Sequence, residues 1–227
     1  MKPYRHELKY YLSHADYAVL SRRLKIAMDR DHFAQEDGNY FIRSLYFDDY
    51  QDSAFLDKMD GNDARDKYRI RIYNLRDDVI KLERKHKQGP YILKHSLSLS
   101  REECDALIAG DCLFLLQRRE AFAKEMYVAF RTGALRPRVL VDYNREAYVF
   151  PYQDVRITFD KNIRTAYRST ALFDANAPTY PAADEYDLVM EIKFNEYLPG
   201  YIHTLVQPVI NAQRSAISKY CLARKYE

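Results

Sequence analysis

Polar and apolar residues alternate at a period of two in six separate stretches of the chain, and most of the polar residues are basic. A β-strand directs alternate side chains to one face, about 7 Å apart along the strand. Each stretch therefore predicts a strand with one charged face and one apolar face. The polar positions are Arg5, Glu7, Lys9, Lys67, Arg69, Arg71, Lys81, Glu83, Lys85, Arg145, Arg156, Thr158, Asp160, Glu191 and Lys193. Several such faces in one chain predict a sheet that binds a polyanion and a metal ion.

The remaining sequence predicts helices that can cover such a sheet. Strands are expected over residues 4–12, 40–47, 67–74, 79–87, 91–96, 138–150, 155–164 and 187–194. Helices are expected after the N-cap Ser13, over residues 52–59, 100–109 and 112–131, and at the C-terminus. Residues 169–184, rich in Ala and Pro, predict a loop. No linker separates two cores, so we expect a single domain over residues 1–227.

The charged faces leave two architectures open. An antiparallel sheet with one solvated face explains each strand taken alone. The predominance of Arg and Lys favours a closed antiparallel barrel with a polar lumen and helices outside, which is an α+β fold. Burying many cations is costly unless an anion fills the lumen, and phosphate chains suit Arg and Lys. The carboxylates Glu7, Glu83 and Glu191 would then hold a divalent ion.

Composition narrows the range of functions. The net charge is only +3, and no compact RNA-binding motif is present, so nucleic acid is not the expected ligand. The N-terminus lacks the apolar core of a signal peptide, and no apolar run is long enough to span a membrane. Three cysteines without metal-ligand spacing are typical of reduced thiols in a cytoplasmic protein.

Seven motifs occur in the order typical of one family: RHELKYYL, IRSLYFDD, KYRIRIYN, IKLERKHK, VDYNREAY, VMEIKF and SKY. Together they resemble the polyphosphate polymerase domain of the vacuolar transporter chaperone (VTC) family, one of the triphosphate tunnel metalloenzymes. The resemblance covers almost the whole chain. It implies a tunnel of about eight antiparallel strands wrapped by helices, and a Mn²⁺ or Mg²⁺ cofactor.

The resemblance also implies roles for individual residues. Glu191 matches the acidic residue that holds the metal ion, with Lys193 beside it, and Lys219 follows Ser218 near the transferred phosphate. The cations implied to act on phosphates in the tunnel are Lys9, Arg69, Arg71, Lys85 and Lys94, with Arg145 and Arg156 on later strands. Lys81 shares the strand face of Lys85 and is expected to bind substrate, while Lys87 is expected at the tunnel mouth.

One departure bears on the activity. In the wider superfamily the first strand carries two Glu residues and a Lys, but Arg5 replaces the first Glu here. This weakens the case for thiamine-triphosphatase or adenylate-cyclase activity and favours a polymerase, with Arg5 as a further substrate-binding cation. The regulatory domain and membrane segments of eukaryotic relatives have no counterpart in these residues, so we expect a free-standing bacterial form.

The expected reaction is metal-dependent phosphoryl transfer from a nucleoside triphosphate, ATP above all, to phosphate or a growing inorganic polyphosphate chain. The expected partners are ATP, pyrophosphate and inorganic polyphosphate. Two alternatives remain open. With water as the acceptor, the same site would be an inorganic tripolyphosphatase. A non-catalytic polyphosphate-binding module is the third interpretation, although such a module gains nothing from carboxylates in its groove.

Overall fold

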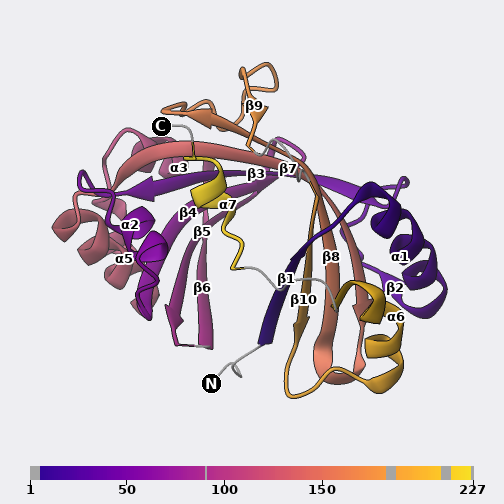
Figure 1. The fold of residues 1–227 in the computed structure, drawn as a ribbon. Coiled ribbons are helices and arrows are strands. Elements are labelled where there is room, and N and C mark those ends of the chain that lie inside the picture. Colours follow the sequence, from indigo (N-terminus) through magenta and orange to yellow (C-terminus); the bar gives the residue numbers. More distant parts are fainter. Residues whose placement is uncertain (1–5, 90, 183–187, 211–215, 226–227) are drawn as a thin grey trace.

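The computed structural model describes residues 6–89, 91–182, 188–210 and 216–225, which form a curled antiparallel sheet with helices mainly on its outer side (Figure 1). The main strands are β1 (His6–Tyr11), β3 (Asn39–Asp48), β4 (Ala64–Tyr73), β5 (Arg76–Gln88), β6 (Tyr91–Leu99), β7 (Arg136–Phe150), β8 (Val155–Tyr167) and β10 (Leu188–Phe194). Two short strands, β2 (Asp29–Arg30) and β9 (Tyr180–Pro181), pair with β7 and β8. The helices are α1 (His14–Ala27), α2 (Ser53–Met59), α3 (Arg101–Ile108), α4 (Phe114–Gln117), α5 (Ala121–Thr132), α6 (Gly200–Ile210) and α7 (Lys219–Leu222), with one 3₁₀ turn (Tyr152–Asp154).

The main strands follow the order β1-β10-β8-β7-β3-β4-β5-β6. The two predicted hairpins are confirmed: β4 pairs with β5 and β7 pairs with β8, both antiparallel. Ser13 caps α1 as expected, because its hydroxyl accepts a hydrogen bond from the Asp16 backbone N–H. None of the described helices is long and apolar enough to cross a membrane.

The sheet does not close. Within the described residues β1 pairs only with β10 and β6 only with β5, so two edge strands remain. The prediction of a closed barrel is therefore wrong, and the fold is an open half-barrel. Side chains cross the gap instead of a backbone ladder: Lys85 Nζ on β5 lies 2.9 Å from Glu7 Oε1 on β1. In Figure 1 the described residues 216–218, which lead into α7, lie between the two walls.

Helices cover the convex face of the half-barrel, as the apolar strand faces predict. Helices α3, α4 and α5 pack on β3 to β6, and helices α1 and α6 pack on β1, β8 and β10 (Figure 1). The first core includes Leu45, Ile70, Leu82, Leu107, Leu115 and Met126. The second core includes Leu20, Leu24, Ile157, Met190, Ile192 and Ile202. Burying these apolar faces leaves the charged faces of the same strands on the concave side.

Residues 112–131 do not form the single long helix that their apolar spacing predicts. The stretch forms α4 and α5, because Arg118 leaves the helical conformation, with φ −74° and ψ 146°. Its guanidinium lies 3.4 Å from a Glu103 carboxylate oxygen and donates to the backbone carbonyl of Ser98. These contacts with α3 and β6 hold the break in place.

Candidate functional site

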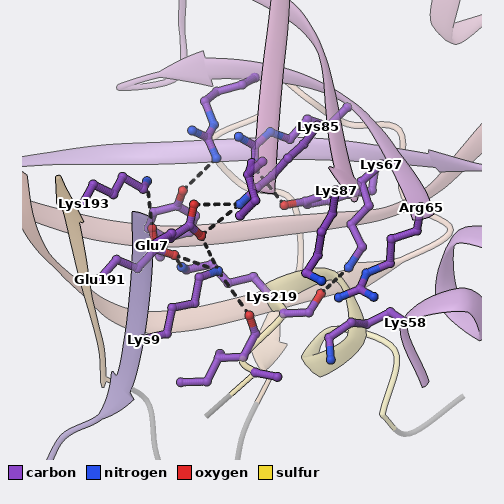
Figure 2. A pocket seen from close by; sticks show the side chains of 18 of the residues that line it. Glu7, Lys9, Lys58, Arg65, Lys67, Lys85, Lys87, Glu191, Lys193 and Lys219 are labelled. Carbon is purple, nitrogen blue, oxygen red and sulfur yellow. Dashed lines mark hydrogen bonds and ion pairs between the residues drawn. The ribbon is translucent and has the colours of Figure 1, made fainter. Parts of the chain in front are cut away.

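The concave face encloses a cavity of about 460 Å³ whose lining is mainly basic (Figure 2). Among the described residues the lining cations are Lys9, Lys58, Arg65, Lys67, Arg69, Arg71, Lys85, Lys87, Arg145, Lys193 and Lys219. In the part of the chain that the structure describes, two carboxylates, Glu7 and Glu191, belong to the same lining. Eleven cations facing two carboxylates leave a large excess of positive charge, and a bound anion would neutralise it.

Two arginines of β4, Arg69 and Arg71, are held in place by hydrogen bonds to other side chains of the protein. Arg69 Nε donates to Glu83 Oε2 at 2.7 Å, and its Nη1 donates to the Tyr46 hydroxyl at 2.9 Å. Arg71 Nη2 donates to the Tyr143 hydroxyl at 2.9 Å. These partners hold the guanidinium groups in place and leave their other N–H groups for phosphate oxygens.

Lys9 joins the two carboxylates on the opposite wall. Its Nζ lies 3.0 Å from Glu7 Oε1 and 3.3 Å from Glu191 Oε1, and it donates to the Ile217 carbonyl at 3.1 Å. Lys193 Nζ lies 3.0 Å from the other oxygen of Glu191. The antiparallel pairing of β1 with β10 places Lys9 opposite Glu191 and thereby creates this cluster.

The C-terminal helix contributes a further cation to the same cluster. Lys219 Nζ donates to Glu191 Oε1 at 3.0 Å and lies 2.5 Å from Asp160 Oδ2. Arg145 Nε donates to the other Asp160 oxygen at 2.6 Å. Asp160 is fully buried, and a buried carboxylate needs compensating charge. Arg145 and Lys219 supply it.

Burial and neighbouring cations act in opposite directions on the cavity carboxylates. Burial alone would raise the pKa of Glu191, but Lys193 and Lys219 hold that pKa well below its usual range. Burial likewise opposes ionisation of Glu7, yet Lys85 and Lys9 hold its pKa well below the usual range. Both side chains are therefore carboxylates at neutral pH.

Burial lowers the pKa of three lysines of the cavity, Lys58 and, more strongly, Lys67 and Lys85. Burial lowers the pKa of Lys85 to about 7, although Glu7 partly offsets the effect. Burial also lowers the pKa of Lys67 to about 8. A nearby anion favours the charged form of a lysine, so a bound polyanion would raise the pKa of Lys67 and Lys85 and keep them protonated near neutral pH.

Four cations gather on one side of the cavity and form what we call the basic rim (Figure 2). The basic rim consists of Lys58, Arg65, Lys67 and Lys87. Lys67 Nζ donates to the Ser218 hydroxyl at 2.6 Å, while Arg65 and Lys87 donate to backbone carbonyl groups. These partners are neutral, in contrast to the carboxylates around Lys9.

The donor set fits a hard divalent cation. Magnesium-type ions prefer oxygen ligands and commonly take one or two carboxylates together with substrate phosphates. Glu7 and Glu191 supply two carboxylates that converge on one point, the ammonium group of Lys9. The described residues contain no group of three or more His, Cys, Asp or Glu side chains placed for a metal ion. The phosphates of a substrate would have to complete the coordination.

Most predicted site residues come together in this cavity. They are Glu7, Lys9, Arg69, Arg71, Lys85, Arg145, Glu191, Lys193, Ser218 and Lys219. Three predicted cations do not line it. Lys81 donates to a hydroxyl on β6 at 2.7 Å, Lys94 to Glu83 at 2.7 Å, and Arg156 to the Tyr40 hydroxyl at 2.8 Å.

Glu83 also stands apart from the cavity. Glu83 is buried behind the lining, and its two oxygens accept hydrogen bonds from Arg69 and Lys94. Arg5 lies outside the described residues. Their roles as a metal ligand and a substrate-binding cation stay predictions, as do the roles of Lys81, Lys94 and Arg156.

The sequence interpretation placed Lys67 on the charged strand face expected to bind a polyanion, but it gave no role to Arg65 or Lys58 of the basic rim. Arg65 and Lys67 continue the alternation of Arg69 and Arg71 towards the start of β4, so the signal was present. Lys58 lies on the short helix α2, and no strand periodicity marks it. Its place in the lining depends on how α2 packs against β4.

A family model for the VTC domain matches residues 4–226. The chain belongs to the VTC domain family. This confirms the family that the seven sequence motifs indicated. A comparison with curated proteins finds no match.

Solved structures share the fold of this VTC domain at low sequence identity. A Hippeastrum protein, described as a proposed adenylyl cyclase with a dominant triphosphatase activity, matches with a TM-score of 0.57 at 14% identity. The match covers 98% of this chain and 95% of the Hippeastrum chain. A proposed adenylate cyclase from Bacillus halodurans matches with a TM-score of 0.53 at 13% identity, over 94% and 95% of the two chains. A Pyrococcus horikoshii protein matches with a TM-score of 0.50 at 13% identity, over 99% and 100%. At these identities the likeness concerns the fold.

Proposed function

We propose that this VTC domain catalyses metal-dependent phosphoryl transfer from a nucleoside triphosphate, ATP above all, to a growing inorganic polyphosphate chain. The observation that carries the proposal is the concave cavity, in which eleven cations and two carboxylates converge. A linear phosphate chain matches this lining in charge along its whole length.

Binding of the donor would fall to Arg69, Arg71 and Lys9. The two guanidinium groups are held by Glu83, Tyr46 and Tyr143, so little side-chain freedom is lost when they bind β- and γ-phosphate oxygens. Lys9 on the facing wall would neutralise the same phosphates from the other side.

The transfer step itself needs little covalent chemistry from the protein. An ionised terminal oxygen of the acceptor attacks the γ-phosphorus, the bond between that phosphorus and the β–γ bridging oxygen breaks, and ADP leaves. The acceptor chain is then one phosphate longer. Lys219 would stabilise the negative charge on the transferred group, and no general base is required because the acceptor oxygen is already ionised.

Glu191 and Glu7 would hold the divalent ion, Mn²⁺ or Mg²⁺. When bound, such an ion would neutralise negative charge on the phosphates of the substrate. Glu83 is left out of this proposed ligand set because it does not line the cavity.

A triphosphatase is the second candidate function. If water replaces the acceptor, the same cavity would hydrolyse ATP or tripolyphosphate. The specific observation in its favour is the shared fold with the Hippeastrum protein, which has a dominant triphosphatase activity. A polyphosphate-binding module without turnover remains the third candidate, and the paired carboxylates Glu7 and Glu191 argue against it.

One incubation separates these candidates. The purified protein is mixed with ATP and Mn²⁺, and the products are separated on a polyacrylamide gel stained for polyphosphate while free phosphate is assayed in parallel. We expect long phosphate chains together with ADP. Free phosphate without chains would identify a hydrolase, and absence of both products would overturn the enzymatic proposal.

A further inference from the structure

The C-terminal helix α7 is fastened by residues that do not themselves line the cavity. The Tyr220 hydroxyl donates to Asp48 Oδ2 at 2.5 Å, and Arg224 Nη1 donates to the same hydroxyl at 2.9 Å. Arg224 Nη2 donates to Asp52 Oδ2 at 2.9 Å. We call Asp48, Asp52, Tyr220 and Arg224 the C-terminal clamp. It ties α7 to the end of β3 and the start of α2.

Asp48 is the centre of the C-terminal clamp. Its side chain is buried, and its carboxylate also accepts hydrogen bonds from the backbone N–H groups of Ala54 at 3.0 Å and Phe55 at 3.1 Å. One carboxylate thus fastens the first turn of α2 and the helix α7 together. Each of these segments carries a cavity cation, Lys58 on α2 and Lys219 on α7.

The clamp reaches the cavity through Tyr220. Lys219 directly precedes Tyr220, and the Tyr220 ring stacks on the Tyr46 ring with centroids 5.1 Å apart. Tyr46 in turn lines the cavity and accepts a hydrogen bond from Arg69. Tyr220 of the clamp is therefore adjacent in sequence to Lys219 and is separated from Arg69 by the Tyr46 ring.

A helix of only four residues cannot hold itself in place, because helix formation has a costly nucleus. The lysine side chain adds several rotatable bonds, and ordering it costs conformational entropy. The geometry points to the C-terminal clamp as a positioning device: Asp48, Tyr220 and Arg224 hold α7 so that the ammonium group of Lys219 meets the phosphate chain. This inference rests on the proposed function, since it assumes that the cavity binds linear phosphates.

A double-mutant cycle on ligand binding tests the inference. Tyr220→Phe removes the clamp hydroxyl but keeps the ring that stacks on Tyr46. Tripolyphosphate affinity is measured by calorimetry, with a chelator and without metal, for wild type, Tyr220→Phe, Lys219→Ala and the double variant. We expect Tyr220→Phe to weaken binding about fivefold in the wild-type background and to have no further effect once Lys219 is absent.

Tyr148→Phe is the matched control. The Tyr148 hydroxyl also donates to a buried carboxylate, Glu146, but this pair packs near α1 and does not line the cavity. We expect Tyr148→Phe to lower the melting temperature and leave tripolyphosphate affinity unchanged. A melting curve for Tyr220→Phe verifies that this variant is folded at the temperature of the titration.

Wild-type affinity in Tyr220→Phe would overturn the inference, and so would a fivefold loss that persists in the Lys219→Ala background. Either result leaves the proposed function intact, because wild type still binds the ligand. If wild type itself binds no tripolyphosphate and yields neither chains nor free phosphate from ATP, the proposed function fails, and the inference fails with it.

Discussion

Two sides of the same cavity compensate their positive charge in different ways. On the carboxylate side, which comprises Glu7, Lys9, Glu191, Lys193 and Lys219, ion pairs of about 3 Å join the cations to protein carboxylates. On the basic rim, the contacts of Lys67, Arg65 and Lys87 are with a hydroxyl and with backbone carbonyls. Strand alternation supplies most residues of both sides, while helices α2 and α7 add Lys58 and Lys219. The two sides differ in that Glu7 and Glu191 lie on β1 and β10.

This contrast separates two tasks. A phosphate that enters the carboxylate side must share its cations with Glu7 and Glu191, so binding there is improved by a further cation such as a metal ion. On the basic rim, Arg65, Lys67 and Lys87 contact neutral groups, so a bound phosphate does not compete there with a protein carboxylate. We therefore expect the carboxylate side to determine turnover and the basic rim to determine affinity for long phosphate chains.

The largest effect should come from the carboxylate side. Glu191→Gln removes the carboxylate that contacts Lys193, Lys219 and Lys9. We expect metal-dependent turnover to fall about 100-fold or more, because the cavity would then lack a carboxylate to hold the divalent ion that neutralises the reacting phosphates. Initial rates with ATP and Mn²⁺ measure this.

Metal-free tripolyphosphate binding is the companion measurement for Glu191→Gln. We expect it to stay at least as tight as in wild type, since a negative charge has been removed from the cavity. If turnover were unchanged, or if binding were lost together with turnover, the assignment of Glu191 to the chemical step would be wrong.

The basic rim should show the reverse pattern. Replacing Arg65 and Lys67 together by alanine is expected to weaken tripolyphosphate binding about tenfold or more, since two hydrogen-bond donors with full charges are lost. Activity at saturating substrate should change much less. Lys124→Ala, on the exposed surface of α5, is the control for net charge alone. A fall in the saturated rate without a change in affinity would contradict the division of tasks.

The pH dependence of binding provides a smaller effect. Lys85 and Lys67, with pKa values of about 7 and about 8, lose protons in the free protein as pH rises from 7 to 9. Because a bound polyanion favours their charged forms, the affinity should fall severalfold over this range. At pH 8 binding should take up protons, which titrations in two buffers of different ionisation enthalpy measure. Lys67→Arg should take up fewer protons than wild type, and equal uptake would refute the role of Lys67.

The smallest effect on function is expected outside the cavity. Glu146 accepts hydrogen bonds from Tyr17 at 2.5 Å and Ser21 at 2.9 Å, and contacts Lys161. Burial opposes ionisation, but the Tyr148 hydroxyl, together with these partners, lowers the pKa of Glu146 to about 2. A carboxyl group with a lowered folded-state pKa stabilises the fold above its unfolded value near 4.5, and this contribution is lost as pH falls towards 2.

Glu146→Gln should therefore lower the free energy of unfolding by about 2 kcal/mol at pH 7 and by less at pH 3. Urea unfolding at both pH values measures the difference. Glu125→Gln, an exposed carboxylate paired with Arg84, is the matched control and should cost less than about 1 kcal/mol. Turnover by folded Glu146→Gln should remain at the wild-type level.

Strand alternation accounts for what the sequence could predict of the site. Lys9, Arg69, Arg71 and Glu191 face the cavity because their neighbours Ile70, Met190 and Ile192 are buried against helices. The same periodicity does not report how far along a strand the cavity extends. Lys81 follows the alternation of Lys85 and still lies beyond the lining.

Long-range packing accounts for what the sequence could not predict. Closure of the barrel depends on whether β1 and β6 meet, and no local pattern encodes that pairing. The contacts of Asp48 with α2 are local, whereas its hydrogen bond from Tyr220 joins residues 172 positions apart in the chain.

The central claim is that the concave cationic face of the half-barrel binds a linear phosphate chain. A crystal structure of the protein with tripolyphosphate tests it most directly. The account predicts phosphate density inside the cavity, in contact with Arg69, Arg71 and Lys9, with one end directed towards the basic rim. Tripolyphosphate bound only on the outer, helix-covered surface, with the cavity side chains still paired to one another, would contradict it.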